Sequence, residues 1–280
     1  MKNISDIDFG ALSEEERAAV LQIMNEIADK GSSDKYTDIL YQDYKEIPVD
    51  IITFIKDPRY LGKAWHLSDG ECKLYPYWED KLRDLFPDNI STSVNNFILS
   101  GARGLGKSEI AVTVMAYLMY RVMCLKNPLE YFGLKPTERI AFSFMNITEA
   151  LAYDIGVSKF QNTIQMSPWF MERGTLSGTK NVEYIPNKNI RFMVGSTLQH
   201  TLGVNIIWAA LDEVNFKNGK NISMEQSKIF EMYSIILERI SSRYLVNGRP
   251  AGMMFLASSK QSQYDFLENY IQKKVEENKR

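Results

Sequence analysis

The sequence predicts an α/β protein with a mostly parallel central sheet flanked by helices. Short apolar runs typical of buried strands alternate along the chain with segments of helical length and composition. The run at 206–211 is continuously apolar, as expected for a central parallel strand. Between residues 96 and 125 a strand pattern, a glycine-rich segment and a helix pattern follow one another. Helical connections of this kind join parallel strands.

The composition of the chain limits the classes of protein to which it can belong. The chain has 280 residues, of which 45% are hydrophobic and 24% charged, with a net charge of -2. This is enough for one large core, or a core with a small appendage. The charge balance excludes a surface that is basic overall. Any contact with DNA would therefore use a local basic patch or be transient. Cys72 and Cys124 are isolated and predict two free thiols in a cytoplasmic protein.

The expected elements follow in order. Ser13 and Glu16 form a capping box, which predicts a helix that ends near Asp29. A second helix is expected to begin after Leu74 and end near Phe86. Beyond the glycine-rich segment we expect strands at 139–144, 182–185, 190–194, 206–211 and 252–257, and helices at 148–166, 224–244 and 264–277.

Three regions are expected along the chain. Residues 1–60 form an N-terminal helical appendage or lid, residues 61–262 form the core, and residues 263–280 form a C-terminal helix or the start of a linker. The sequence opens without the pattern of a signal peptide. The apolar helix after the glycine-rich segment is interrupted by Arg121 and is too short to cross a bilayer, so we expect no membrane partner.

The glycine-rich segment fills every fixed position of the phosphate-loop motif G-x-x-x-x-G-K-[ST]. Glycines let backbone N–H groups turn towards phosphate oxygens, and the following helix adds positive partial charge. Lys107 can then reach the β- and γ-phosphates of ATP, and Ser108 can bind Mg²⁺. The alternative is a chance match in a turn, which the flanking strand and helix disfavour. The candidate nucleotide-binding residues of this loop are Gly101, Ala102, Arg103, Gly104, Leu105, Gly106, Lys107 and Ser108.

Two side chains near this loop have more than one interpretation. Arg103 can bridge γ-phosphate oxygens as charge develops, or pair with Glu213 before ATP arrives; otherwise it is an exposed loop arginine. Trp78 precedes the strand and is placed to stack on a nucleotide base; otherwise it is a core aromatic residue at a helix start.

Two acids directly follow the apolar run at 206–211, in the pattern called Walker B. Asp212 can hold the Mg²⁺ shell, and Glu213 can orient and deprotonate a water molecule that attacks the γ-phosphate. An acid pair favours hydrolysis over transfer to a hydroxyl substrate. The alternative is a strand that ends in solvated acids.

Several other polar residues each have a structural and a functional interpretation. Ser258 and Ser259 follow a strand, where hydroxyl groups face the ligand crevice or cap a helix. Arg243 lies near the apolar stripe of its helix, one turn after Arg239. We favour a pairing of Arg243 inside the domain over a role as an arginine finger towards a neighbouring subunit. The two histidines, His66 and His200, have no companions at metal-ligand spacing.

Three stretches together resemble the large terminase subunit of tailed bacteriophages, the ATP-driven motor that packages DNA into a prohead. The first is the phosphate loop with its embedded Arg103. The second runs from Gly195 to Phe216 and ends in Leu-Asp-Glu-Val-Asn-Phe. The third, from Phe255 to Ser259, looks like the coupling motif. The resemblance spans about residues 74–260.

The resemblance implies a RecA-like P-loop ATPase fold of the additional-strand type with a small helical lid. It also implies roles for individual residues. Lys107 and Arg103 would contact phosphates, Ser108 and Asp212 would serve Mg²⁺, Glu213 would be the catalytic carboxylate, and Ser258 and Ser259 would couple hydrolysis to motion.

The resemblance further implies ATP and Mg²⁺ as cofactors. The expected partners are double-stranded DNA, a portal protein and a small terminase subunit, in a homo-oligomeric ring at an assembly site in the host cytoplasm. An isolated domain is expected to be monomeric and nearly inactive. Family members often carry a glutamine for adenine where this chain has Tyr77 and Trp78. Their C-terminal nuclease domain is expected to be absent here.

Two alternatives to a packaging motor stay open. One is a helicase-like or recombination ATPase on the same fold. The other is a nucleotide-switched binding module that hydrolyses slowly.

Overall fold

The computed structural model describes most of the chain: residues 13–30, 40–66, 70–102, 104–146, 150, 152–174, 177–179, 182–185, 189–195, 204–212, 222–246, 248–259 and 270–272. The chain divides into two compact units. The smaller is Met1–Ile47 with Cys124–Lys126, and the larger is Pro48–Met123 with Asn127–Arg280.

The smaller unit contains α1 (Glu14–Lys30), which begins at the expected capping box. The backbone N–H of Ser13 donates to Glu16 Oε2 at 2.8 Å, and the N–H of Glu16 donates to Ser13 Oγ at 3.3 Å. Two orphan donors at the helix start are thereby satisfied reciprocally, which confirms the capping box. In the same unit, Tyr44 and Leu125 form an isolated antiparallel bridge.

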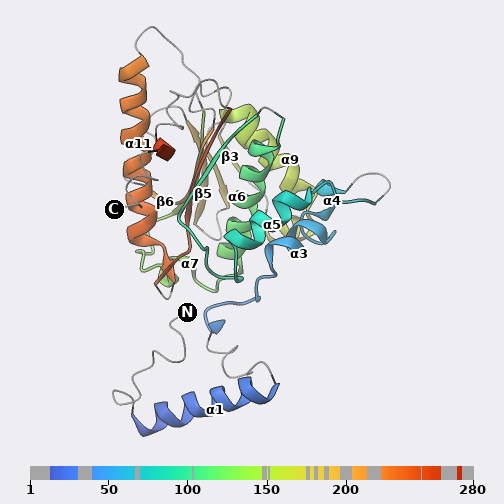
Figure 1. Cartoon of the computed structure of the whole chain (residues 1–280), viewed down its shortest axis with the longest axis vertical. Coiled ribbons are helices and arrows are strands. Elements are labelled where there is room, and N and C mark those ends of the chain that lie inside the picture. The colour runs from blue at the N-terminus through green and yellow to red at the C-terminus, as the bar shows by residue number, and fades with distance from the viewer. Residues whose placement is uncertain are drawn as a thin grey trace. The chain divides into compact units, whose positions relative to one another are not determined.

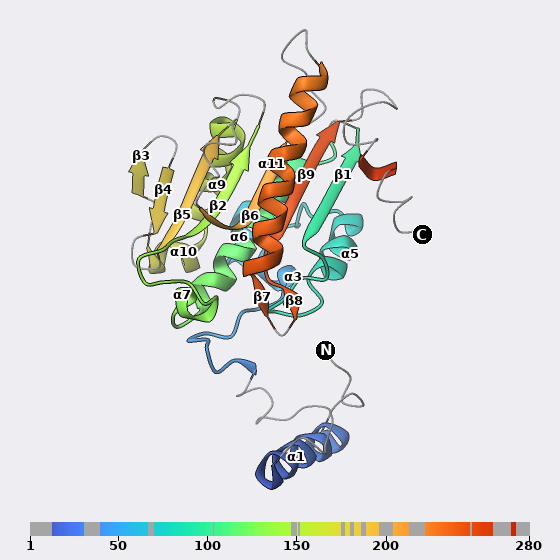
Figure 2. The same cartoon turned by 90° about the vertical axis from the view of Figure 1, so that its left-hand side faces the viewer.

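The larger unit is built on a seven-stranded sheet in the order β1-β9-β6-β2-β5-β4-β3 (Figure 2). The first five of these strands run parallel, and β4 and β3 add antiparallel edge strands. The bounds are β1 (Asn96–Gly101), β2 (Ile140–Met145), β3 (Ser177–Thr179), β4 (Val182–Ile185), β5 (Ile190–Gly195), β6 (Asn205–Asp212) and β9 (Met253–Ser259). A separate hairpin joins β7 (Leu245–Val246) to β8 (Arg249–Pro250).

The strand order identifies the class of fold. Along the chain, β2 is the strand that follows the phosphate-loop motif. In the sheet, however, β1 pairs with β9, and β9 pairs in turn with β6. A strand from late in the chain is therefore inserted between the phosphate-loop strand and the strand that ends in Asp212. This confirms an α/β RecA-like P-loop fold with the expected additional strand.

Helices cover both faces of the sheet (Figure 1). One face carries α11 (Ile222–Arg243), whereas α5 (Pro76–Leu85), α6 (Lys107–Cys124) and α9 (Lys159–Gln165) lie on the other face. Shorter segments are α3 (Ile51–Lys56), α4 (Gly62–Trp65), α7 (Pro128–Tyr131), the π-helical η3 (Ala152–Ser158) and α10 (Pro168–Arg173).

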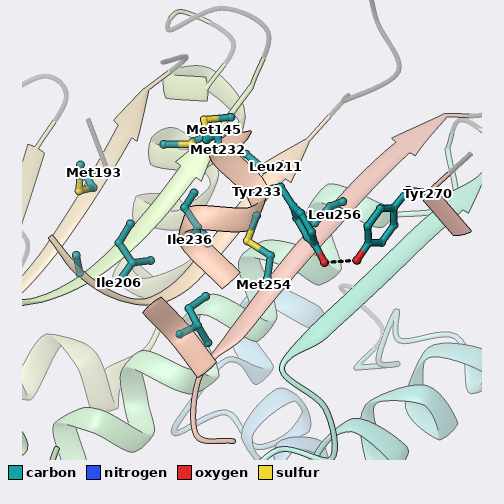
Figure 3. Packing of buried hydrophobic residues seen from close by; sticks show 13 residues of the cluster. Met145, Met193, Ile206, Leu211, Met232, Tyr233, Ile236, Met254, Leu256 and Tyr270 are labelled. Atoms are coloured by element: carbon teal, nitrogen blue, oxygen red, sulfur yellow. Dashed lines mark hydrogen bonds between the residues drawn. The ribbon is translucent and has the colours of Figure 1, made fainter. Parts of the chain in front are cut away.

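A core cluster joins α11 to the sheet (Figure 3). From the helix come Met232, Tyr233, Ile236 and Ile240, at the spacing of one helix face. From the strands come Ala141, Met145, Met193, Ile206, Ala209, Leu211, Met254 and Leu256. The phenol of Tyr233 also hydrogen-bonds the phenol of Tyr270, at 2.5 Å.

The opposite layer is centred on α6, which is buried on all sides. No residue from Ile110 to Met123 is more than 4% exposed. A helix that is apolar all round belongs inside a core, which explains the composition of this segment. None of the helices in the described part of the chain combines the length and apolarity that crossing a membrane requires.

One expected helix is divided. Residues 148–166 were predicted as a single helix, but the described part contains the π-helical η3 followed by α9. Gly156 lies in η3 directly against Phe144 of β2, where an added Cβ would approach the ring to 2.7 Å. The close approach of helix and strand requires this glycine. The expected helix at 264–277 lies mostly outside the described residues, of which 270–272 are helical.

Asp88 fastens the connection between α5 and β1. Its Oδ1 accepts the backbone N–H groups of Ile90 and Ser91, at 2.9 and 2.6 Å. Its Oδ2 accepts Ser91 Oγ at 2.7 Å and Arg249 Nη1 at 3.1 Å. Because Arg249 belongs to β8, this carboxylate ties the entry of β1 to the hairpin that precedes β9.

The same contacts set the pKa of Asp88. Burial acts to raise this pKa, but the hydrogen bonds from Ser91 and Ile90 and the charge of Arg121 outweigh burial. The net pKa of Asp88 is therefore below its usual value. A carboxyl group with a lowered pKa stabilises the fold above its unfolded pKa, and this contribution is lost as the pH falls through the folded pKa.

We predict that Asp88→Ala lowers the free energy of unfolding by about 1–3 kcal/mol at pH 7, because several donors lose their acceptor. The difference from wild type should shrink as the pH falls below about 4 towards the lowered folded pKa of Asp88, because the carboxyl group of the unfolded chain takes up its proton first. Denaturant unfolding at pH 7, 5, 4 and 3 measures this. The control is Asp84→Ala, since the Asp84 side chain is 70% exposed. A difference that stays constant over this pH range contradicts the assignment.

Candidate active site

The phosphate loop connects the end of β1 to the start of α6. Gly104 and Gly106 have φ angles of +83° and +75°. These left-handed conformations suit glycine and disfavour residues with a Cβ, so the glycines permit the turn. The helix begins where Ile110 N–H donates to Gly106 O at 2.9 Å. The first N–H groups of α6 have no partner within the helix, and a helix start of this kind favours anions.

Lys107 stands at the start of α6 and is only 8% exposed. Its ammonium group donates to Ala102 O at 2.7 Å and to Gly101 O at 3.2 Å. The side chain therefore folds back over the beginning of its own loop. This places a positive charge within the same turn that presents the glycine N–H groups.

Asp212 at the carboxyl end of β6 meets this loop. Ser108 Oγ donates to Asp212 Oδ2 at 2.8 Å, although 104 residues separate them in sequence. Asp212 is 4% exposed. The phosphate-loop segment and the acid after the apolar strand are thus in contact, although they are distant in sequence.

The strand register places the two serines between these segments. Ser258 lies opposite Ser100 and Ser259 opposite Gly101, while Ala257 lies opposite Asp212. Ser258 is fully buried. The carboxyl end of β9 therefore fills the space between the phosphate loop and Asp212.

Trp78 contacts the phosphate loop from α5. Its indole Nε1–H donates to Leu105 O at 3.0 Å, and the residue is 7% exposed. Tyr77 packs edge-on against this indole with ring centroids 5.1 Å apart, and Tyr77 itself is 61% exposed. The contact of Trp78 with the loop is through a backbone carbonyl, so the tryptophan supports the loop. Its stacking on a base stays a prediction.

Sequence reasoning overlooked Asn146 at this edge of the sheet. The register between β2 and β6 ends with Met145 opposite Leu211, so the next residues, Asn146 and Asp212, are neighbours. Asn146 is 6% exposed. The available signal was a polar residue directly after an apolar strand, the same signal that identified Asp212.

Several predicted residues lie outside the described part of the chain, namely Arg103, Glu213 and His200. Glu213 directly follows Asp212 in sequence. His66, which is described, forms an isolated bridge with Cys72. In the part of the chain that the structure describes, no three or more His, Cys, Asp and Glu residues form a group that could hold a metal.

Arg243 lies at the other end of the sheet and pairs within the domain. Its Nη1 donates to Asn205 Oδ1 at the start of β6 and lies 3.9 Å from Glu138 Oε1. This confirms the structural pairing that we favoured for Arg243. Arg239, one turn earlier, donates to Val204 O at 3.2 Å.

The strand order, the phosphate-loop segment and its contact with Asp212 are those of a P-loop domain. The chain belongs to the family described as "Uncharacterized protein MJ0330, N-terminal P-loop domain", whose model matches residues 15–279. No curated protein matches the chain.

Solved structures similar to the chain include three phage terminases. The HK97 bacteriophage large terminase is 17% identical with a TM-score of 0.49, over 82% of this chain and 41% of that one. The large terminase of the thermophilic bacteriophage D6E is 12% identical with a TM-score of 0.38, over 66% and 39%. A mutant of a Thermus phage large terminase ATPase domain is 12% identical with a TM-score of 0.30, over 65% and 81%.

The chain spans about two fifths of the length of the first two terminases.

We predict that Trp78→Phe weakens nucleotide binding about 2- to 10-fold, because it removes one hydrogen bond to the loop and keeps an aromatic ring. Displacement of a fluorescent ATP analogue by ATP and by inorganic tripolyphosphate measures this. A tryptophan that supports the loop lowers the affinity for both ligands. A tryptophan that only stacks on the base leaves tripolyphosphate unchanged, which would contradict the supporting role. Trp65→Phe, at a buried tryptophan in α4, is the control.

Proposed function

We propose that this chain binds and hydrolyses ATP at the site between the phosphate loop and the end of β6. The observation that carries the proposal is the hydrogen bond from Ser108 Oγ to Asp212 Oδ2 at 2.8 Å. Two segments with independent phosphate and metal signatures meet in a partly buried contact at the carboxyl edge of a parallel sheet. Ligands bind at this edge in α/β proteins.

The residues fit a magnesium ion carried on ATP. A hydroxyl and a carboxylate oxygen are hard ligands of the kind Mg²⁺ takes, and Mg²⁺ on a nucleotide usually uses one or two protein groups with phosphates and water. Ser108 and Asp212 would hold it. When bound, the ion neutralises charge on the phosphate oxygens.

The chain supplies the remaining parts of the reaction. N–H groups at the start of α6 and the loop bind phosphate oxygens, and Lys107 turns from the carbonyls of Gly101 and Ala102 to the β- and γ-phosphates. Glu213 orients water and accepts its proton as the water oxygen attacks phosphorus. The bond from the γ-phosphorus to the bridging oxygen breaks, which yields ADP and phosphate.

The sequence motifs support a proposal for the process that ATP hydrolysis drives. Arg103 in the phosphate loop, the stretch that ends in Asp212 and Glu213, and the serines of β9 resemble the terminase motifs in the same order. We therefore propose a motor that moves double-stranded DNA into a viral prohead as a ring, with a portal protein and a small terminase subunit. Arg103 assists at the γ-phosphate, and Ser258 and Ser259 transmit its loss through β9.

Hydrolysis is tested by Lys107→Ala and Glu213→Gln in the full chain. Lys107→Ala should weaken ATP binding and lower the hydrolysis rate about 100-fold or more, because a charge that stabilises the transferred phosphate is lost. Glu213→Gln should retain ATP binding and lower the rate about 10²- to 10⁴-fold. Phosphate release and binding of a fluorescent analogue measure both quantities.

Controls for hydrolysis are Lys63→Ala and Glu172→Gln, at an exposed lysine of α4 and a glutamate of α10 whose side chain is 60% exposed. Wild-type rates in both Lys107 and Glu213 variants would overturn the site. Slow single-turnover hydrolysis that neither DNA nor partners accelerate would instead indicate a nucleotide-switched module.

Coupling to DNA is tested by comparing the ATPase rate with double-stranded and single-stranded DNA of equal length. We expect greater stimulation by the duplex, and a further increase with portal-bearing proheads. Because phosphate contacts release counterions, stimulation should decline as salt rises from 50 to 200 mM. Stronger stimulation by single strands, or unwinding of a duplex, would favour a helicase-like enzyme. Ser258→Ala should lower stimulation more than it lowers the basal rate.

A further inference from the structure

Asn146 lies beside the proposed metal ligand Asp212. On the paired strands the last matched positions are Met145 and Leu211, and each strand continues with one polar residue. The backbone N–H of Asn146 donates to Gly195 O at 3.4 Å, which extends the pairing of β2 with β5 by one residue. The backbone of Asn146 is therefore held in the sheet, at the level of Asp212.

Side-chain alternation puts Asn146 and Asp212 on the same face. Met145 and Leu211 both belong to the core cluster under α11, on one face of the sheet. Because successive side chains of a strand alternate, Asn146 and Asp212 face the layer of α6. Asp212 hydrogen-bonds Ser108 in the first turn of α6, which shows directly that Asp212 is on the face covered by α6.

The neighbouring residues agree with this placement. Phe144, two residues before Asn146, packs near Trp208 of β6 with ring centroids 6.3 Å apart, and it also contacts Gly156 of η3. Beside η3, Lys159 of α9 pairs with Glu109 in the first turn of α6, at 3.4 Å. Elements that pack on this face of β2 thus reach the same helix start that holds Ser108.

The chemistry of an asparagine suits this position. A buried carboxamide can donate to a carboxylate and accept from a metal-bound water molecule at the same time. It adds no negative charge next to Asp212, where a further carboxylate would repel this acid and the phosphates. At 6% exposure, the amide of Asn146 is removed from bulk water, so its hydrogen bonds are directional and costly to lose.

We propose that Asn146 is a positioning residue of the metal–nucleotide site. Its carboxamide orients the carboxylate of Asp212 and the water shell of Mg²⁺. This inference rests on the proposed ATP site and extends it to a second strand, so that β2, β6 and β9 each end in a polar group at the site. Residues that orient a metal ligand typically contribute about 10- to 100-fold to metal affinity.

The test is magnesium-dependent nucleotide binding in the full chain, which does not require turnover. A fluorescent ATP analogue is titrated in EDTA and then with increasing MgCl₂. We expect Asn146→Ala to bind the metal-free analogue within about 2-fold of wild type, but to need about 10-fold more Mg²⁺ for half of the metal-induced gain in affinity. An asparagine with only a structural role would change thermal stability without moving this midpoint.

The second variant is Asn146→Asp, which keeps the shape of the side chain. Its added charge should weaken metal-free binding several-fold, and Mg²⁺ should restore a larger part of the affinity than in wild type. This variant decides the question if Asn146→Ala fails to fold. Asn205→Ala is the matched control, because Asn205 is another 6%-exposed asparagine, at the opposite end of β6. It should lower the melting temperature and keep the wild-type magnesium midpoint.

The outcomes separate this inference from the proposed function. Wild-type protein that binds no nucleotide overturns both. Wild-type protein that binds nucleotide with a clear gain from Mg²⁺, together with unchanged magnesium dependence in both Asn146 variants, overturns only the role of Asn146.

Discussion

The structure depends on the meeting of two strand ends that are distant in sequence, Gly101 of β1 and Asp212 of β6. They are not hydrogen-bonded neighbours, because β9 lies between them. Hence the loop that leaves β1 must bend across the end of β9 before Ser108 can contact Asp212. The two positive φ angles in the loop permit this bend. Because β9 lies between the two strands, any movement of β9 would change the separation of the loop and Asp212.

A rigid base makes this geometry reproducible. The site stands on the first turn of α6, and α6 is buried along nearly its whole length. Close packing on all sides leaves the helix little freedom to shift, so the amide groups at its start keep their direction. Trp78 extends this support to the loop itself through Leu105 O. The loop is thus held from two elements, while Leu105 remains 50% exposed.

Prediction from the sequence was most successful where a short pattern of residues determines the local structure by itself. The capping box, the phosphate loop and the acid after an apolar strand were all predictable, because each needs particular residue types at a fixed spacing. The bounds of α3 were not predicted, because residues 1–60 were expected only as a helical appendage. The decisive feature is Asp50, whose carboxylate accepts the N–H groups of Ile52 and Thr53 at 3.0 Å. The contacts of Trp78 and Asn146 were not predictable, because they depend on which strands and helices become neighbours.

The polar residues at the two ends of the sheet make different kinds of contact. At the amino end of β6, Asn205 takes part in a closed set of contacts: its side chain bonds Arg243 and Glu138, and its carbonyl accepts the phenol of Tyr244 at 2.7 Å. Burial raises the pKa of Tyr244, so this phenol stays a neutral donor at any physiological pH. At the carboxyl end, the polar residues Asn146, Asp212 and Ser258 instead lie at the edge of the sheet where the glycine loop leaves β1. A parallel sheet directs all its carboxyl ends to one edge, so polar residues that follow the apolar strands come together there. The same rule separates the structural pairs at the amino end from the edge where a ligand would bind.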